Sequence, residues 1–295
     1  MLKKTHTKIA LGTVQFGMKY GVSNISGQVN NSEVKKILDR ATDSNIVTID
    51  TAAVYGDSEE IIGKIGVSNF NIITKLKPMP SGADASSWAF NCVNSSLKKF
   101  NLNKIYGLLV HKSEDLLGGS GTQLYKSLCK LKHDGIINKI GVSIYSPKEL
   151  DQLYENNIIL DIVQSPFNIF DRRLKSSGWL EKLKFDGVEV HIRSIFLQGL
   201  LLQKLDKIDP YFYKWYEFLS NFDQWVHESG LSRIDACVNF AFSHKEIDKI
   251  VVGVQTENQL KEIIISSEKK YIIKTPEYFE LNEEKLIDPT NWITS

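Results

Sequence analysis

The chain has 295 residues, of which 42% are apolar and 24% charged, and its formal net charge is +1. This composition is typical of a globular protein, and the near-zero charge gives no electrostatic footprint for nucleic acid or an anionic membrane. The apolar runs are well short of the roughly 18 residues that a membrane span needs. The length suits two ordinary domains or one α/β barrel, which typically has about 250 residues.

The N-terminal stretch and the cysteines indicate the cellular setting. The chain starts with basic residues and passes directly into a strand-like run, without a signal peptide's apolar core and cleavage site. Cys92, Cys129 and Cys237 lie far apart and lack metal-ligand spacing, so we expect reduced thiols and no metal site. These features predict a cytoplasmic protein without membrane or nucleic-acid partners.

Strand-like and helix-like patterns alternate along almost the whole chain. The predicted strands are Ile9–Gly12, Val47–Asp50, Ile72–Lys75, Tyr106–His111, Ile140–Ser143, Leu160–Gln164, Val188–Arg193 and Ile250–Gly253. The predicted helices are Ser32–Ser44, Ser58–Ile65, Ala85–Phe100, Gly121–Asp134, Pro147–Asn156, Arg173–Phe185, a long stretch Tyr211–Phe242, and Glu257–Ser267, with another starting at Thr275 and Pro276. Strict alternation calls for a parallel sheet with crossover helices, and eight units favour a closed (β/α)8 TIM barrel.

An open-sheet dinucleotide-binding fold is the main competing class, and the sequence argues against it. The expected G-x-G-x-x-G does not follow the first strand, where GTVQFG has the wrong spacing. The LGGSG stretch, Leu117–Gly121, is interpreted as a pocket rim rather than a phosphate cradle. We therefore predict one α/β barrel domain over residues 1–295, with extra helices between strands seven and eight and at the C-terminus.

Six of the predicted strands end on a polar side chain, at the face where a (β/α)8 barrel builds its active site. These residues are Asp50, Lys75, His111, Ser143, Gln164 and Arg193. Because side chains alternate faces along a strand, Asp50, Lys75 and His111 are expected to converge at the barrel mouth. Tyr55, in the loop after Asp50, can fold back over them. By the same alternation, Glu189 and His191 are interpreted as a polar pair inside the barrel.

These side chains suggest the reduction of a carbonyl group. A phenol has an ordinary pKa of about 10, and a lysine ammonium within hydrogen-bond reach of Tyr55 would lower it. Asp50 would supply the counter-charge that a buried Lys75 needs. His111 could orient the carbonyl oxygen, which completes a proton donor with an oxyanion clamp. Since no side chain donates a hydride, a nicotinamide cofactor must bring it.

The chain resembles the aldo-keto reductase superfamily, in its bacterial form, from about Lys8 to Ser267. The resemblance rests on LGTVQFG, IDTAAVYGDSEEIIGK, ITKL, LLVH, IGVSIYS, DIVQSPFN, FLQGLLL and VVGVQTENQLKEI, in family order. It implies that Tyr55 is the general acid, that Lys75 and Asp50 tune it, and that His111 positions the carbonyl. It further implies a cofactor site, with Ser143 and Gln164 on the nicotinamide carboxamide and Gly253, Gln255, Gln259 and Glu262 at the adenosine end.

The chain departs from the family pattern at several cofactor positions. Ile144 replaces an asparagine, which weakens the carboxamide contact on that side. Arg193 replaces an aromatic residue that stacks on the nicotinamide, and a planar guanidinium can stack too. Val254 and Gln259 stand where basic residues often grip the 2′-phosphate of NADP, and Ile263 replaces an asparagine. The resemblance favours NADP(H) over NAD(H), whereas these residues leave NAD(H) open.

The sequence therefore predicts an NAD(P)H-dependent oxidoreductase acting on a small-molecule aldehyde or ketone, for which a sugar-derived carbonyl is one candidate. Two alternatives stay open. One is a non-catalytic barrel that binds the cofactor as a regulatory or scaffold subunit, and the other is a sugar isomerase or lyase on the same barrel. We expect a monomer or a weak homo-oligomer.

Overall fold

The computed structural model describes residues 7–269, 271 and 274–293. Eight parallel strands close into a barrel in chain order. They are β1 (Ile9–Gly12), β2 (Thr48–Asp50), β3 (Asn71–Lys75), β4 (Ile105–Val110), β5 (Ile137–Ser143), β6 (Ile162–Pro166), β7 (Glu189–Arg193) and β8 (Lys249–Gly253). β1 pairs with β8, with Ile9 opposite Ile250 and Gly12 opposite Gly253, so the sheet has no free edge. The (β/α)8 prediction is confirmed.

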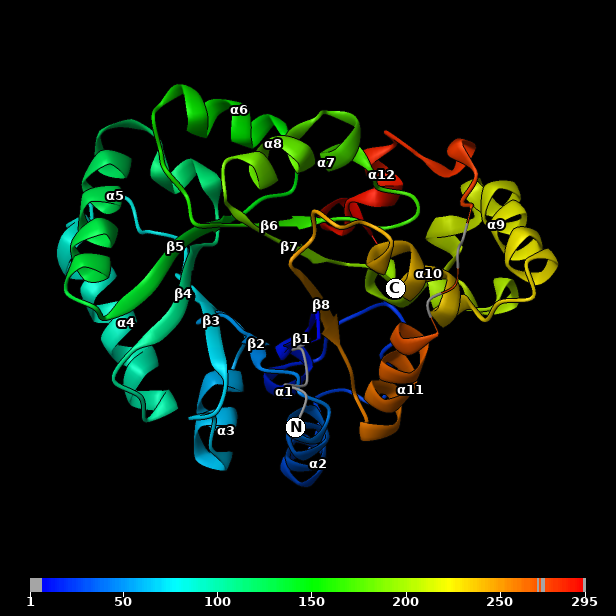
Figure 1. Ribbon diagram of the computed structural model, residues 1–295, viewed down its shortest axis with the longest axis horizontal. Helices are drawn as coiled ribbons and strands as arrows, with labels where there is room; N and C mark the ends of the chain where they lie inside the picture. The colour runs from blue at the N-terminus through cyan, green and yellow to red at the C-terminus, as the bar shows by residue number, and fades with distance from the viewer. Residues whose placement is uncertain (1–6, 270, 272–273, 294–295) are drawn as a thin grey trace.

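Helices surround the barrel and cover its apolar outer face (Figure 1). The α-helices are α1 (Val14–Gly17), α2 (Asn31–Asp43), α3 (Ser58–Ile65), α4 (Ala85–Phe100), α5 (Gly118–His133), α6 (Lys148–Glu155), α7 (Arg173–Ser176), α8 (Trp179–Phe185), α9 (Tyr216–Glu228), α10 (Arg233–Phe242), α11 (Glu257–Glu268) and α12 (Glu284–Ile287). Short 3₁₀ turns are η1 (Ser113–Leu116), η2 (Leu197–Leu202), η3 (Leu205–Lys207), η4 (Pro210–Trp215), η5 (Glu277–Phe279) and η6 (Pro289–Asn291). No helix in this described part of the chain is both long and apolar enough to cross a membrane.

Two predicted helices are each divided in the structure. The stretch Arg173–Phe185 becomes α7 and α8, because Gly178 between them adopts a left-handed backbone with φ of +80°. The stretch Tyr211–Phe242 becomes η4, α9 and α10. Gly230, with φ of +68°, follows the end of α9, and the side chain of Ser232 then caps α10.

The C-terminal segment is not the continuous helix that Thr275 and Pro276 suggested. It consists of η5, α12 and η6. Side-chain packing holds this segment in place, rather than a continuous run of helical backbone hydrogen bonds. Phe279 is fully buried, with its ring centroid 5.8 Å from that of Phe222 on α9. Arg172 donates a hydrogen bond of 2.9 Å to the Pro276 carbonyl. The last part of the chain is thereby fastened to the loop after β6.

The floor of the barrel holds a charged network around Glu189. Its carboxylate accepts hydrogen bonds from Tyr106 at 2.8 Å and Lys139 at 2.6 Å, and its other oxygen lies 3.2 Å from His191 Nε2. Burial alone would raise the pKa of Glu189, but the bonds from His191, Lys139 and Tyr106 outweigh it and lower the pKa to about 2. The predicted Glu189–His191 pair is confirmed as part of this network.

Replacing Glu189 with glutamine is expected to destabilise the barrel by about 1–2 kcal/mol near neutral pH, because Lys139 loses a partly buried counter-charge. A carboxyl with a lowered pKa stabilises the fold above its unfolded value of 4.5 and loses that contribution as the pH falls toward about 2. The free energy of unfolding of wild type, measured in urea, should therefore fall as the pH drops from 4.5 toward about 2. That of the variant should change less over the same range. An equal acid response in both proteins would contradict this role for Glu189.

Candidate active site

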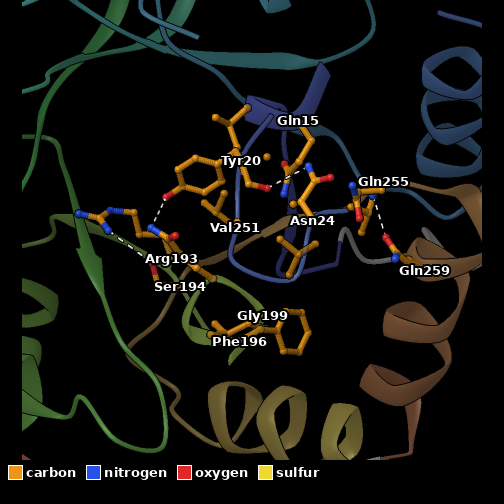
Figure 2. Close-up of a pocket in the computed structure, with 18 of the residues that line it drawn as sticks. Gln15, Tyr20, Asn24, Arg193, Ser194, Phe196, Gly199, Val251, Gln255 and Gln259 are labelled. Atoms are coloured by element: carbon orange, nitrogen blue, oxygen red, sulfur yellow. Dashed lines mark hydrogen bonds between the residues drawn. The ribbon is translucent and has the colours of Figure 1, made fainter. Parts of the chain in front are cut away.

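A cavity of about 290 Å³ opens at the carboxyl ends of the strands, between the loops that follow β1, β7 and β8. Figure 2 shows Arg193 and Ser194 on one side of it and Gln255 and Gln259 on the other. The wall also includes Asp50 and Tyr55 from β2 and its loop. The site therefore lies where the polar strand ends predicted it.

Asp50 and Lys75 form a buried ion pair at the centre of the site. Lys75 Nζ donates to Asp50 Oδ1 at 2.6 Å and to the Thr51 carbonyl at 3.0 Å, and both charged side chains are almost fully buried. The strand register explains the contact, because Asp50 pairs with Ile73 and Lys75 lies two residues further along the same face. The predicted pairing of Asp50 with Lys75 is present.

The turn after β2 brings Tyr55 over this pair. The backbone N–H of Tyr55 bonds to the Ala52 carbonyl at 3.0 Å, and Gly56 follows with φ of +52°. A Cβ on Gly56 would lie 2.2 Å from the Gly17 carbonyl oxygen, so the backbones of the β1 and β2 loops can meet only at glycine. Lys75 Nζ then lies 5.2 Å from the centroid of the Tyr55 ring.

His111 completes the group of four predicted residues. Its ring meets the Tyr55 ring edge-on, with centroids 6.2 Å apart and an interplanar angle of 85°. Its Nδ1 is buried and has no hydrogen-bond partner. Burial, together with the charges of Lys75 and Arg193, lowers the pKa of His111 to about 4. The imidazole is therefore neutral at neutral pH, with one N–H to donate.

The pKa of Tyr55 moves in the direction opposite to the one expected from Lys75. Burial raises it above its ordinary value of 10, and the charge of Asp50 raises it further, against an opposing effect of Arg193. The Lys75 ammonium is directed at Asp50 and Thr51, and burial lowers its own pKa. Tyr55 is therefore a neutral phenol that retains its proton at neutral pH.

Ser143 and Gln164 lie side by side, paired in register between β5 and β6. Gln164 Nε2 donates to Asp50 Oδ2 at 2.7 Å, which leaves its Oε1 buried without a partner. An orphaned buried acceptor of this kind is costly unless a ligand satisfies it. An amide N–H₂, such as that of a nicotinamide carboxamide, has the matching chemistry.

Arg193 lines the cavity, with one face of its guanidinium on Tyr145. The guanidinium carbon is 4.3 Å from the Tyr145 ring centroid, and Nη2 donates to the Ile144 carbonyl at 3.1 Å. The Ile144 side chain itself is buried away from the cavity wall. The segment after β5 thus holds Arg193 through Tyr145 and through the backbone of Ile144.

All four residues expected at the adenosine end line the cavity: Gly253, Gln255, Gln259 and Glu262. Gln259 Oε1 accepts from the backbone N–H of Gln255 at 2.7 Å, and Gln255 Nε2 is buried without a partner. A Cβ on Gly253 would lie 2.6 Å from Gln15 Oε1, so this wall depends on a residue without a side chain.

Gln15 is a residue of the wall that the sequence did not point to. Gln15, in α1, has a buried Oε1 without a partner, and its only sequence signal is its place in LGTVQFG. Tyr20 accepts a hydrogen bond of 3.0 Å from Gln198 Nε2, and Val22 N–H bonds to the Gln198 carbonyl at 3.2 Å. These contacts join the β1 and β7 loops across the cavity. The LGGSG stretch, in contrast, starts α5 and does not line the cavity.

The structure also places some predicted residues outside the cavity wall itself. Asp50 and Tyr55 line it, whereas Lys75 and Gln164 are joined to it through hydrogen bonds to Asp50, and His111 through its ring contact with Tyr55. Within the described residues, no three His, Cys, Asp or Glu side chains gather as a metal site would require.

Comparisons with known proteins show the family of this chain. The model of the Aldo/keto reductase family matches residues 8–279. An L-glyceraldehyde 3-phosphate reductase of Escherichia coli O157:H7 is 28% identical over 211 residues, which cover 63% of this chain and 60% of the relative. An aldo-keto reductase of Mycolicibacterium smegmatis is 27% identical over 135 residues, 43% of this chain and 45% of its own length. The chain thus spans about 60% of the length of the first of these relatives.

Solved structures share the fold at lower identity. A glycerol dehydrogenase from Gluconobacter oxydans superposes with a TM-score of 0.69 at 21% identity, covering 92% of this chain and 89% of that one. An aldo-keto reductase from Bacillus halodurans, in its holo form, gives a TM-score of 0.70 at 18% identity, covering 88% and 86%. These likenesses confirm the barrel architecture.

Proposed function

The chain belongs to the aldo/keto reductase family, whose members are oxidoreductases, and we propose that it reduces a small-molecule aldehyde or ketone with NAD(P)H. The observation that carries this proposal is the convergence of four side chains at one point of the barrel mouth. A buried Asp50–Lys75 ion pair lies beside a neutral Tyr55 and a neutral His111.

Each of these groups has a part in the proposed reaction. A bound nicotinamide would supply a hydride, and with it the electron pair of the new C–H bond at the carbonyl carbon. The carbonyl oxygen gains negative charge and takes the proton from Tyr55 Oη, which gives an alcohol. His111, neutral and with one N–H, donates a hydrogen bond to the same oxygen and orients it.

Lys75 and Asp50 act on Tyr55 rather than on the substrate. Tyr55 holds its proton firmly in the unliganded site, because its pKa is raised. When the proton leaves, phenolate charge develops near the Lys75 ammonium, which lies 5.2 Å from the ring centroid. Asp50 keeps that ammonium in place at 2.6 Å. Lys75 therefore stabilises the phenolate charge as it forms. An interaction that strengthens in the transition state in this way accelerates the reaction.

Two unpaired amides support a nicotinamide dinucleotide as the cofactor: Gln164, which is hydrogen-bonded to Asp50, and Gln255 in the wall. Gln164 Oε1, beside Asp50, can accept from a carboxamide N–H, and Gln255 Nε2, at the other end, can donate to a ribose hydroxyl. Ser143, Arg193, Gly253, Gln259 and Glu262 complete the proposed binding set. The resemblance favours NADP(H), and the charges around the adenosine end affect the choice between NADP(H) and NAD(H).

Two other functions are less well supported. A regulatory barrel without catalysis would have no use for a proton donor poised beside a buried lysine. A sugar isomerase or lyase would leave the orphaned amides of Gln164 and Gln255 unexplained. We propose one domain over residues 1–295, in the cytoplasm, as a monomer or weak homo-oligomer without nucleic-acid or membrane partners. Light scattering would test the assembly.

The proposed function predicts cofactor binding and turnover in the same protein. In calorimetric titration, NADH or NADPH should bind with a dissociation constant in the micromolar range or below, and cofactor oxidation should then follow the addition of small aldehydes. 5′-AMP serves as the control ligand, since it carries the adenosine end without the nicotinamide. Failure of both dinucleotides to bind would refute the reductase, and binding without turnover of any carbonyl would favour the regulatory barrel.

A further inference from the structure

The adenosine end of the cavity is lined by amides and one carboxylate. The side chains that gather there are Gln15, Asn24, Gln255, Gln259 and Glu262. Among the described residues that line the cavity, Arg193 is the sole cation, and Figure 2 shows it on the side opposite Gln255 and Gln259. A phosphate placed near the glutamines would meet no positive side chain of the wall.

The N-terminus of α11 lies at this end of the cavity and already has its own acceptors. Thr256 Oγ1 accepts from the N–H of Gln259 at 3.2 Å, and Glu33 Oε1 accepts from the N–H of Glu257 at 2.8 Å. Free N–H groups at a helix N-terminus form a ready anion site. Here a carboxylate from α2 takes up one of them, and this bond to the Glu257 N–H lowers the pKa of Glu33.

Two cations beside this helix end, Arg40 and Lys36, are paired with carboxylates. Arg40 Nε donates to Glu257 Oε1 at 2.5 Å, and Lys36 Nζ lies 3.1 Å from Glu33 Oε2. A phosphate near the start of α11 would have to compete with Glu257 and Glu33 for these two side chains. It would also face the carboxylate of Glu262 in the wall.

Resting on the proposed function, we infer that the adenosine end selects NAD(H) over NADP(H), with Gln255 as the specificity-determining residue. The ribose 2′-hydroxyl is neutral and can bond to the unpaired, buried Nε2 of Gln255. A 2′-phosphate brings a charge of about −1.5 to −2 to an end of the cavity whose described wall has one carboxylate, Glu262, and no cation. This revises the preference for NADP(H) that the resemblance implied.

Calorimetric titration with NADH and NADPH tests the inference directly. Wild type should bind NADH at least about tenfold more tightly than NADPH, the size of one charge interaction in a partly exposed site. Gln255→Arg should lower the ratio of the NADPH to the NADH dissociation constant by about tenfold or more. Glu262→Gln should lower it by a smaller factor, because it removes repulsion without adding attraction.

Asn258→Arg is the matched control. Asn258 is exposed on the first turn of α11 and is not part of the cavity wall. The substitution therefore adds the same charge three residues along the chain from Gln255. Its ratio of dissociation constants should stay within about threefold of wild type, as for a screened surface charge. Thermal melts of each variant would show that the barrel remains folded.

The outcomes separate the inference from the proposed function. Tighter binding of NADPH than of NADH by wild type would overturn the inference and leave the reductase standing. Equal gains from Gln255→Arg and Asn258→Arg would remove Gln255 as the specificity residue. Binding of neither cofactor would refute the proposed function, and the inference with it.

Discussion

Replacing Tyr55 with phenylalanine is expected to lower kcat for carbonyl reduction by about 10²- to 10⁴-fold, the usual contribution of a positioned general acid. The substitution removes one oxygen atom, so the ring contact with His111 and the tight turn to Ala52 can remain. Cofactor affinity should change little. Steady-state kinetics on a small aldehyde, with calorimetry for the cofactor, would measure both quantities.

Tyr20→Phe is the matched control for this experiment. Tyr20 lines the same cavity, and burial raises its pKa to about 12, but its hydroxyl bonds to Gln198 rather than pointing at the Asp50–Lys75 pair. Its loss should alter cofactor affinity and leave kcat within about tenfold of wild type. If Tyr55→Phe kept most of its turnover, or if both variants lost it equally, Tyr55 would not be the proton donor.

Lys75→Met is expected to reduce both activity and stability. Removing one partner of a buried ion pair leaves the other charge uncompensated, which typically costs about 3–5 kcal/mol of the free energy of unfolding. The Asp50 carboxylate would keep its hydrogen bond from Gln164 but lose the one from Lys75. Turnover should fall by about 10²-fold or more, because phenolate charge would then develop at Tyr55 without a nearby ammonium.

The double variant Asp50→Asn with Lys75→Met separates these two effects. It removes both charges, so most of the lost stability should return, while turnover should stay low. Urea unfolding and kcat, measured on wild type and on each variant, complete the cycle. Recovery of turnover together with stability would mean that Lys75 supports the fold and does not assist proton transfer.

The polar strand ends were predictable because a strand has a fixed period. Asp50 and Lys75 follow buried apolar runs in adjacent strands, so alternation alone places them on one face, and the structure joins them at 2.6 Å. The charged pair on β7 follows from the same rule. Closure of the barrel follows from counting eight β–α units.

The loop contacts and the pKa of Tyr55 could not be predicted in this way. Positive φ angles occur at three non-glycine residues after β7: Ser194, Leu197 and Gln198. No local sequence pattern indicates this backbone conformation. The bond from Gln198 to Tyr20 joins residues 178 positions apart. The pKa of Tyr55 rises because of burial and the position of Asp50, and both depend on the whole packed site.

The pairing of β1 with β8 has a consequence for how the chain is made. β1 is synthesised about 240 residues before its partner residues Ile250–Gly253. At about 5–20 residues per second, this leaves β1 with one unpaired edge for roughly ten to fifty seconds. Barrel closure therefore waits for the synthesis of β8, and until then the nascent chain carries an open sheet.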